Sequence, residues 1–118
     1  MPKFCQRLKI ALRDEREADI GACFDSAWQF ICAARREGGR VLVHCKMGRS
    51  RSATVVLMAM FRTGLFSLRT AWEHLRACRR QISLNTGFIQ TLIGMEKSVT
   101  GRASTVRWDE KSQRIWMN

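Results

Sequence analysis

Apolar and polar residues alternate in two different ways over the first third of the chain. Residues 3–12 are apolar at every second position from Leu8 onward, which predicts a strand with one buried face. A charged loop follows at residues 13–18. Apolar side chains then recur at three- and four-residue steps, which predicts a helix from a cap at Asp19 to about residue 37. Two glycines at 38 and 39 end it.

The middle of the chain is more uniformly apolar. Residues 41–43 (Val-Leu-Val) form a short run without alternation, which predicts a strand buried on both faces. Residues 52–61 are apolar almost all round, which predicts a helix in the centre of a core, ended by Gly64. Ser67 and Asn85 are good N-caps for two further helices, each with an apolar stripe.

Beyond residue 98 the pattern weakens, and two interpretations stay open. Val106 and Trp108 precede a polar run, and Ile115 and Met117 follow it, so residues 99–118 form either a small hairpin or a disordered tail. We expect the catalytic unit to occupy residues 1–98.

The order of strand, helix, strand, loop and three helices predicts an α/β domain. Its two strands should lie parallel, joined by a right-handed crossover, in a central, mainly parallel sheet flanked by helices. The loop after the second strand then lies at the carboxyl edge of the sheet, where α/β proteins bind ligands.

The net charge of the chain indicates a class of binding partner. The 118 residues carry a net charge of +11, which favours phosphoproteins, phosphoinositide surfaces or nucleic acid. Aromatic and basic residues do not alternate as they would in a platform for single strands, so no specific nucleic acid is expected. A basic domain without any specific polyanion partner is the plainer alternative.

The number and spacing of the cysteines indicate the cellular compartment. The five cysteines are odd in number and form no CxxC pair, so neither a zinc site nor a disulfide framework is expected, and no cofactor is implied. Cys23, Cys32 and Cys78 are best explained as buried core residues. The chain shows no signal peptide and no apolar run that could span a bilayer, so we expect a cytoplasmic or nuclear protein.

The candidate chemistry follows the second predicted strand. Five residues separate Cys45 from Arg51. A loop of that length can wrap its backbone N–H groups round one tetrahedral anion, with the arginine closing the ring. The predicted phosphate-binding loop consists of Cys45, Lys46, Met47, Gly48, Arg49, Ser50 and Arg51.

The loop and the two residues that flank it carry the predicted chemistry. The loop N–H groups, the helix dipole and Arg51 favour the thiolate of Cys45, so we expect a strongly lowered pKa and a nucleophilic sulfur. The planar guanidinium of Arg51 matches two phosphoryl oxygens. Gly48 permits a tight turn, Ser52 can donate a hydrogen bond to the departing sulfur, and His44 orders the loop.

Phosphoester cleavage also needs a proton donor for the leaving oxygen. The charged loop at residues 13–18 follows the carboxyl end of the first predicted strand and offers Asp14, Glu15 and Glu17, with Asp19 just beyond. Asp19 is better explained as the helix cap, and the two glutamates suit a solvated loop. Spacing alone leaves Asp14 as the remaining candidate.

The stretch from His44 to Ser52 resembles the signature of the cysteine-based protein phosphatases. The flanking sequence at residues 18–20, 24–31 and 39–53 is similar to the dual-specificity phosphatases in particular, and the resemblance runs over residues 4–97. That family usually has further strands and a helix before the segment near residue 3, so we expect an amino-terminally shortened version of its fold.

The resemblance implies a set of roles. In that family an aspartate ten residues before the helix phenylalanine is the general acid, and counting back from Phe24 reaches Asp14. The nucleophile falls on Cys45, the phosphate-binding arginine on Arg51 and the leaving-group hydroxyl on Ser52.

The resemblance implies a metal-free phosphatase of phosphotyrosine, and of phosphoserine and phosphothreonine, acting through a cysteinyl phosphate. Two alternatives remain. The basic residues Lys46 and Arg49 beside the nucleophile resemble phosphatases of phospholipid headgroups, which would dock on anionic membranes. A shortened scaffold that misplaces Asp14 would instead give a phosphoprotein-binding module with weak catalysis.

Overall fold

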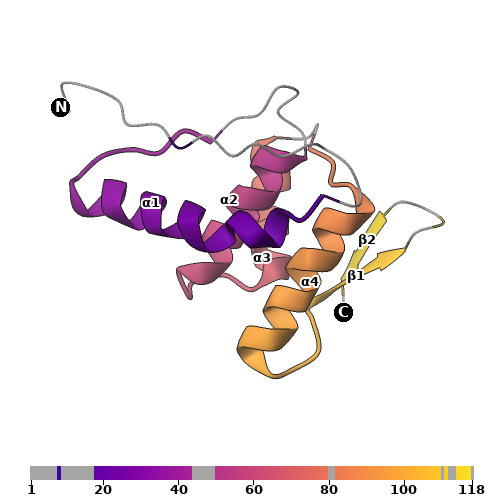
Figure 1. Cartoon of the computed structure of the whole chain (residues 1–118). Coiled ribbons are helices and arrows are strands. Elements are labelled where there is room, and N and C mark those ends of the chain that lie inside the picture. Colours follow the sequence, from indigo (N-terminus) through magenta and orange to yellow (C-terminus); the bar gives the residue numbers. More distant parts are fainter. Residues whose placement is uncertain are drawn as a thin grey trace.

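The computed structural model describes residues 8, 18–43, 50–79, 82–109 and 111, together with the backbone of residues 114–117. Within these residues, a 3-10 turn η1 and four α-helices precede one pair of strands (Figure 1). The elements are η1 (Ile20–Cys23), α1 (Phe24–Arg36), α2 (Arg51–Arg62), α3 (Leu68–Cys78), α4 (Thr86–Thr100), β1 (Val106–Asp109) and β2 (Arg114–Met117).

The predicted helix caps are confirmed. The Asp19 carboxylate accepts a hydrogen bond from the N–H of Ala22 at 3.3 Å, at the start of η1. Ser67 forms a reciprocal capping box with Thr70 on α3. The Asn85 side chain accepts from the third N–H of α4 at 2.9 Å. Local side-chain chemistry therefore determines where these helices begin.

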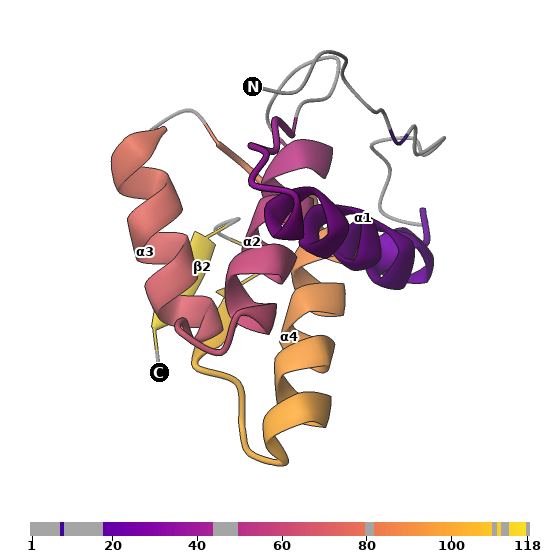
Figure 2. The ribbon, with the colours of Figure 1, turned by 90° about the vertical axis from the view of Figure 1, so that its left-hand side faces the viewer.

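Helix α2 is the centre of the core, as its all-round apolar sequence predicts. Figure 2 shows α2 between α3 and α4, and in Figure 1 α1 runs across it. Leu57 and Met58 on α2 are fully buried. At the far end of α2, Arg62 pairs with Asp25 of α1 at 2.8 Å. Helix α2, and with it the residues at its amino end, is therefore held in place by three neighbouring helices.

The predicted strand at residues 41–43 is wrong. These residues form no strand, and Leu42 is 84% exposed, although the prediction buried both faces. Val41 and Val43 do pack against the core, so only one side of the segment is covered. A strand needs a hydrogen-bonded neighbour, and the part of the chain that the structure describes places none beside it. The predicted partner at 3–12 lies outside the described residues except for Leu8.

The central parallel sheet is likewise not found within the described ranges. The sheet present there is antiparallel, with Val106 opposite Met117 and Asp109 opposite Arg114. It is the hairpin that the sequence left as one of two alternatives for residues 99–118. The division of the chain at residue 98 stays a prediction, and α4 itself extends to Thr100.

The three cysteines that the structure describes are less buried than expected. Cys78 is exposed, so its assignment to the core is wrong, and Cys23 and Cys32 are only partly buried. The reason lies in the packing of α3, whose amino-terminal half carries its buried side chains. Cys78 is the last residue of that helix and lies beyond the buried stripe.

A buried carboxylate connects the hairpin to the helices. Glu96 of α4 is only 2% exposed, and its oxygens accept hydrogen bonds from the N–H of Leu68 at 2.8 Å and the N–H of Thr105 at 2.7 Å. The hydroxyl of Ser104 donates to it at 2.7 Å. Because this one side chain receives donors from α3 and from the segment before β1, the base of the hairpin is fixed to the helical core.

Candidate active site

The candidate site begins at Ser50, the residue before α2. Ser50 is 4% exposed, and its carbonyl oxygen accepts hydrogen bonds from both the N–H and the hydroxyl of Thr54, at 2.9 and 2.7 Å. Its own side chain makes no capping bond to α2 among the described residues, unlike Ser67 on α3 and Asn85 on α4. Among the described residues, Ser50 therefore precedes the helix without capping it through its side chain.

The Ser50 hydroxyl is directed to another helix. It accepts a hydrogen bond from the backbone N–H of Asn85 at 3.2 Å, across 35 positions of sequence. Asn85 simultaneously caps α4 with its side chain. The carboxyl end of the predicted phosphate-binding loop is therefore attached to the first turn of α4.

Arg51 and Ser52 are the first two residues of α2. Arg51 is half-buried and Ser52 is buried, so neither belongs to an open solvated loop. The amino end of a twelve-residue helix carries a partial positive charge and inward-facing N–H groups, both of which favour an anion. The sequence prediction that Arg51 and Ser52 stand together at a helix start is consistent with this arrangement, and their chemical roles stay predictions.

The remaining predicted site residues lie outside the described residues. These are Asp14, His44, Cys45, Lys46, Met47, Gly48 and Arg49.

Cys23 differs chemically from the predicted nucleophile. Its thiol donates to the carbonyl oxygen of Ile20 at 2.9 Å. Burial raises the pKa of the Cys23 thiol above its ordinary value. A protonated, hydrogen-bonded thiol is a poor nucleophile, so Cys23 is a structural residue.

Within the described ranges, no group of three or more histidine, cysteine, aspartate or glutamate side chains is placed to hold a metal ion. No helix in that same part of the chain has the length and apolar content needed to cross a membrane.

Sequence reasoning does not reveal two contributors to this region, Thr54 and Asn85, or the more distant contacts of Glu96. The apolar pattern places Thr54 inside a helix and the cap rule places Asn85 at a helix start, and neither predicts a bond to Ser50. Asn85 and Glu96 form hydrogen bonds to residues 35 and 28 positions away. No local sequence pattern predicts these bonds. A threonine inside an apolar helix is the one available signal, because its hydroxyl can bond to the carbonyl four residues earlier.

Comparison with known proteins defines the class. Residues 2–98 match the family model described as the dual specificity phosphatase catalytic domain. The chain is 40% identical over 94 residues to Dual specificity protein phosphatase 1B of Arabidopsis thaliana, covering 80% of this chain and 56% of that protein. It is 34% identical over 110 residues to the Arabidopsis phosphatase PHS1, covering 93% of this chain and 12% of that protein.

A solved structure has the same fold. A mouse dual specificity phosphatase in complex with zinc tungstate superposes with a TM-score of 0.76 at 31% identity, covering 80% of this chain and 59% of that one. The fold and the sequence thus point to the same class, that of the dual specificity phosphatases. The chain belongs to the dual specificity phosphatase family.

Proposed function

We propose that the protein hydrolyses phosphotyrosine, and phosphoserine and phosphothreonine, in phosphoproteins. The observation that carries the proposal is the run His44 to Ser52 within the family match, whose last three residues stand at the amino end of helix α2. A loop that ends there directs its final N–H groups toward an anion.

The first step forms a phosphoenzyme. The thiolate of Cys45 attacks phosphorus in line, so that a sulfur–phosphorus bond forms while the bond to the ester oxygen breaks. Asp14 gives its proton to that leaving oxygen. The guanidinium of Arg51 and the loop N–H groups hold the equatorial oxygens as charge develops on them.

The second step returns the free enzyme. Asp14, now a carboxylate, takes a proton from water as the water oxygen attacks phosphorus. The sulfur–phosphorus bond breaks, inorganic phosphate leaves, and the thiolate of Cys45 accepts a hydrogen bond from Ser52. His44 keeps the loop in the shape that both steps need. No metal or cofactor takes part, and the thiolate requires a reducing compartment such as the cytoplasm or nucleus.

A second candidate is a phosphatase of phosphoinositides or other phospholipid headgroups. Two observations favour it. The chain superposes with a TM-score of 0.62, at 32% identity, on the structure of PTPMT1 in complex with PI(5)P, covering 69% of this chain and 52% of that one. The net charge of +11 would also attract an anionic membrane surface.

The test is a substrate panel measured on the wild type and on Cys45→Ser. The panel holds para-nitrophenyl phosphate, phosphotyrosine and phosphoserine peptides, and phosphoinositide vesicles. We expect turnover of the phosphopeptides by the wild type and none by Cys45→Ser. Cys78→Ser, which changes an exposed thiol on α3, is the matched control and should keep full turnover.

The outcomes separate the candidates. Faster turnover of the vesicles than of the peptides would replace the protein substrate by a lipid one. Folded wild type that binds vanadate but turns over no substrate would identify a binding module with a misplaced Asp14. Equal turnover by Cys45→Ser and wild type would contradict the phosphatase mechanism itself.

A further inference from the structure

The hairpin reaches the same turn that holds the end of the phosphate-binding loop. The indole N–H of Trp108, on β1, donates a hydrogen bond to the hydroxyl oxygen of Thr86 at 3.2 Å. Thr86 is buried and is the first residue of α4. Figure 1 shows β1 running beside α4, in agreement with the contacts between them.

The residue next to Thr86 makes the bond to the loop. Asn85 donates its N–H to the Ser50 hydroxyl at 3.2 Å, and Ser50 directly precedes Arg51. Two successive residues of one turn are thus held by two different parts of the chain, Asn85 by Ser50 and Thr86 by the hairpin. A rotation of this turn that lengthened one bond would also move the other.

Trp108 is itself held in place, which a positioning residue requires. Two residues before it, Val106 is buried in the main core cluster. One residue earlier still, Thr105 donates its N–H to Glu96 at 2.7 Å. The indole is half-buried against that core, so its N–H presents a fixed donor to Thr86.

We propose that Trp108 is a positioning residue for the phosphate-binding loop, acting through Thr86 and Asn85 on Ser50. Trp108 lies beyond residues 2–98, where the family match ends, so this support comes from the part of the chain that the family model does not describe. The proposal rests on the proposed function, because it assigns Trp108 to that same site.

The first measurement is the inhibition constant of vanadate together with kcat for para-nitrophenyl phosphate. Trp108→Phe keeps an aromatic ring but removes the donor, and Thr86→Val removes the acceptor at similar volume. We expect each to weaken vanadate binding by about 3- to 10-fold, the range that one net hydrogen bond supplies. Thr86→Ser keeps the hydroxyl and should stay at the wild-type value.

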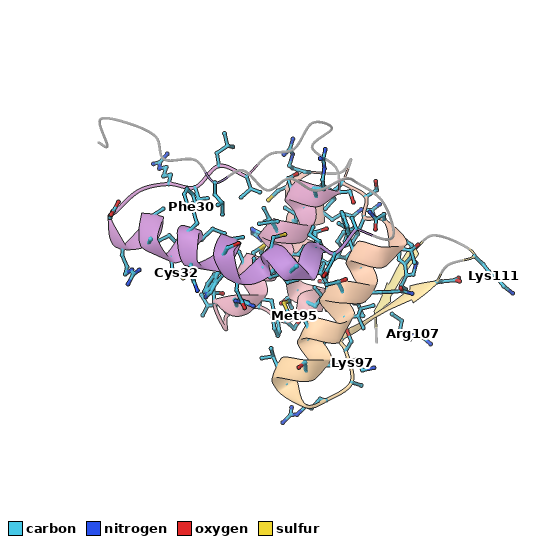
Figure 3. All side chains as sticks on the ribbon, in the orientation of Figure 1. Phe30, Cys32, Met95, Lys97, Arg107 and Lys111 are labelled. Carbon is cyan, nitrogen blue, oxygen red and sulfur yellow. The ribbon has the colours of Figure 1, made fainter. Side chains whose placement is uncertain are left out.

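Two controls separate positioning from general loss of stability. Trp28→Phe makes the same exchange at a partly buried tryptophan of α1, and Arg107→Ala changes the neighbour whose side chain points away from the helices (Figure 3). Neither should change the vanadate constant. Urea unfolding measured on every variant restricts the comparison to folded protein.

A double-mutant cycle locates the path. If Trp108 acts through Ser50, Trp108→Phe should add less than about 2-fold to the vanadate constant in a Ser50→Ala background. Full additivity of the two effects would overturn the proposal, and so would a wild-type constant in both Trp108→Phe and Thr86→Val. A wild type that neither binds vanadate nor turns over substrate would instead contradict the proposed function, and this inference with it.

Discussion

The two ends of α4 hold the molecule together in different ways. At the amino end, Asn85 and Thr86 exchange single, uncharged hydrogen bonds of 3.2 Å with Ser50 and Trp108. Further along, the Glu96 carboxylate receives donors at 2.7 to 2.8 Å from Leu68, Ser104 and Thr105. Hydrogen bonds to a charged group are roughly twice as strong as neutral ones. The same helix therefore contributes stability at Glu96 and holds Ser50 at its amino end.

The comparison predicts separable effects. Damage at Glu96 should mainly lower the free energy of unfolding and affect the site only indirectly, through the hairpin. Damage at the amino end should cost less stability and more activity.

The largest expected effect on stability is that of Glu96→Ala. It leaves the N–H groups of Leu68 and Thr105 buried without their acceptor, and we expect a loss of about 3 kcal/mol in the free energy of unfolding. Urea denaturation checks this. Below the unfolding transition, kcat per folded molecule should stay within about 3-fold of the wild type, because Glu96 reaches Ser50 only indirectly, through Thr105 and the hairpin.

Glu73→Ala is the matched control, because Glu73 is an exposed glutamate paired with Arg69. It should cost less than about 0.5 kcal/mol. A Glu96→Ala protein as stable as Glu73→Ala would remove the stabilising end of the comparison.

The pH dependence of stability sharpens the same contrast. Burial acts to raise the pKa of Glu96, but hydrogen bonds from Leu68, Thr105 and Ser104 outweigh it and hold the pKa below its ordinary value. A lowered folded pKa stabilises the protein above the ordinary glutamate pKa of about 4.3, and the contribution is lost as pH falls through the folded value.

Urea midpoints measured from about pH 7 down to about pH 3 should therefore fall more steeply for the wild type than for Glu96→Gln, which cannot titrate. Parallel pH profiles for the two proteins would show that the Glu96 carboxylate contributes nothing to acid sensitivity.

At the amino end, Asn85→Ala should lose the cap of α4, worth about 1 kcal/mol of stability. Because the turn also holds Ser50, we expect kcat/KM to fall by about 3- to 10-fold. Ser67→Ala removes an equivalent cap from α3 and should cost similar stability with unchanged kcat/KM. Equal kinetic losses in both variants would mean that cap removal acts through stability alone.

The smallest expected effect on stability is that of Asp25→Asn. Asp25→Asn breaks the ion pair between α1 and the far end of α2. Because Asp25 is exposed, the loss should stay below about 0.5 kcal/mol by urea denaturation, and activity should not change. A change in kcat here would show that remote ends of α2 are coupled, against the separation described above.

The features that the sequence predicted are those with a local cause. Asp19, Ser67 and Asn85 cap helices through bonds to residues three positions away, and the apolar composition of α2 requires a central position. The segment 41–43 failed because burial of a short apolar run depends on neighbours that the run itself does not encode. Glu96 and the bond from Asn85 to Ser50 depend on tertiary contacts, which periodicity cannot show.

The hairpin stands between these cases. Its alternation of Val106 and Trp108 was readable, but an isolated hairpin is marginal in water, so the sequence left a disordered tail as an equal alternative. The contacts to Glu96 and Thr86 decide the matter, and both partners come from α4.

The central claim is that Cys45 carries the phosphoryl group during turnover. Rapid acid quenching of the wild type with para-nitrophenyl phosphate, followed by mass spectrometry of its peptides, tests it directly. We predict one added phosphoryl group on the sulfur of Cys45 in the steady state, and none in Cys45→Ser. Turnover with the phosphoryl group on another residue, or with wild-type protein that never becomes phosphorylated, would contradict the account.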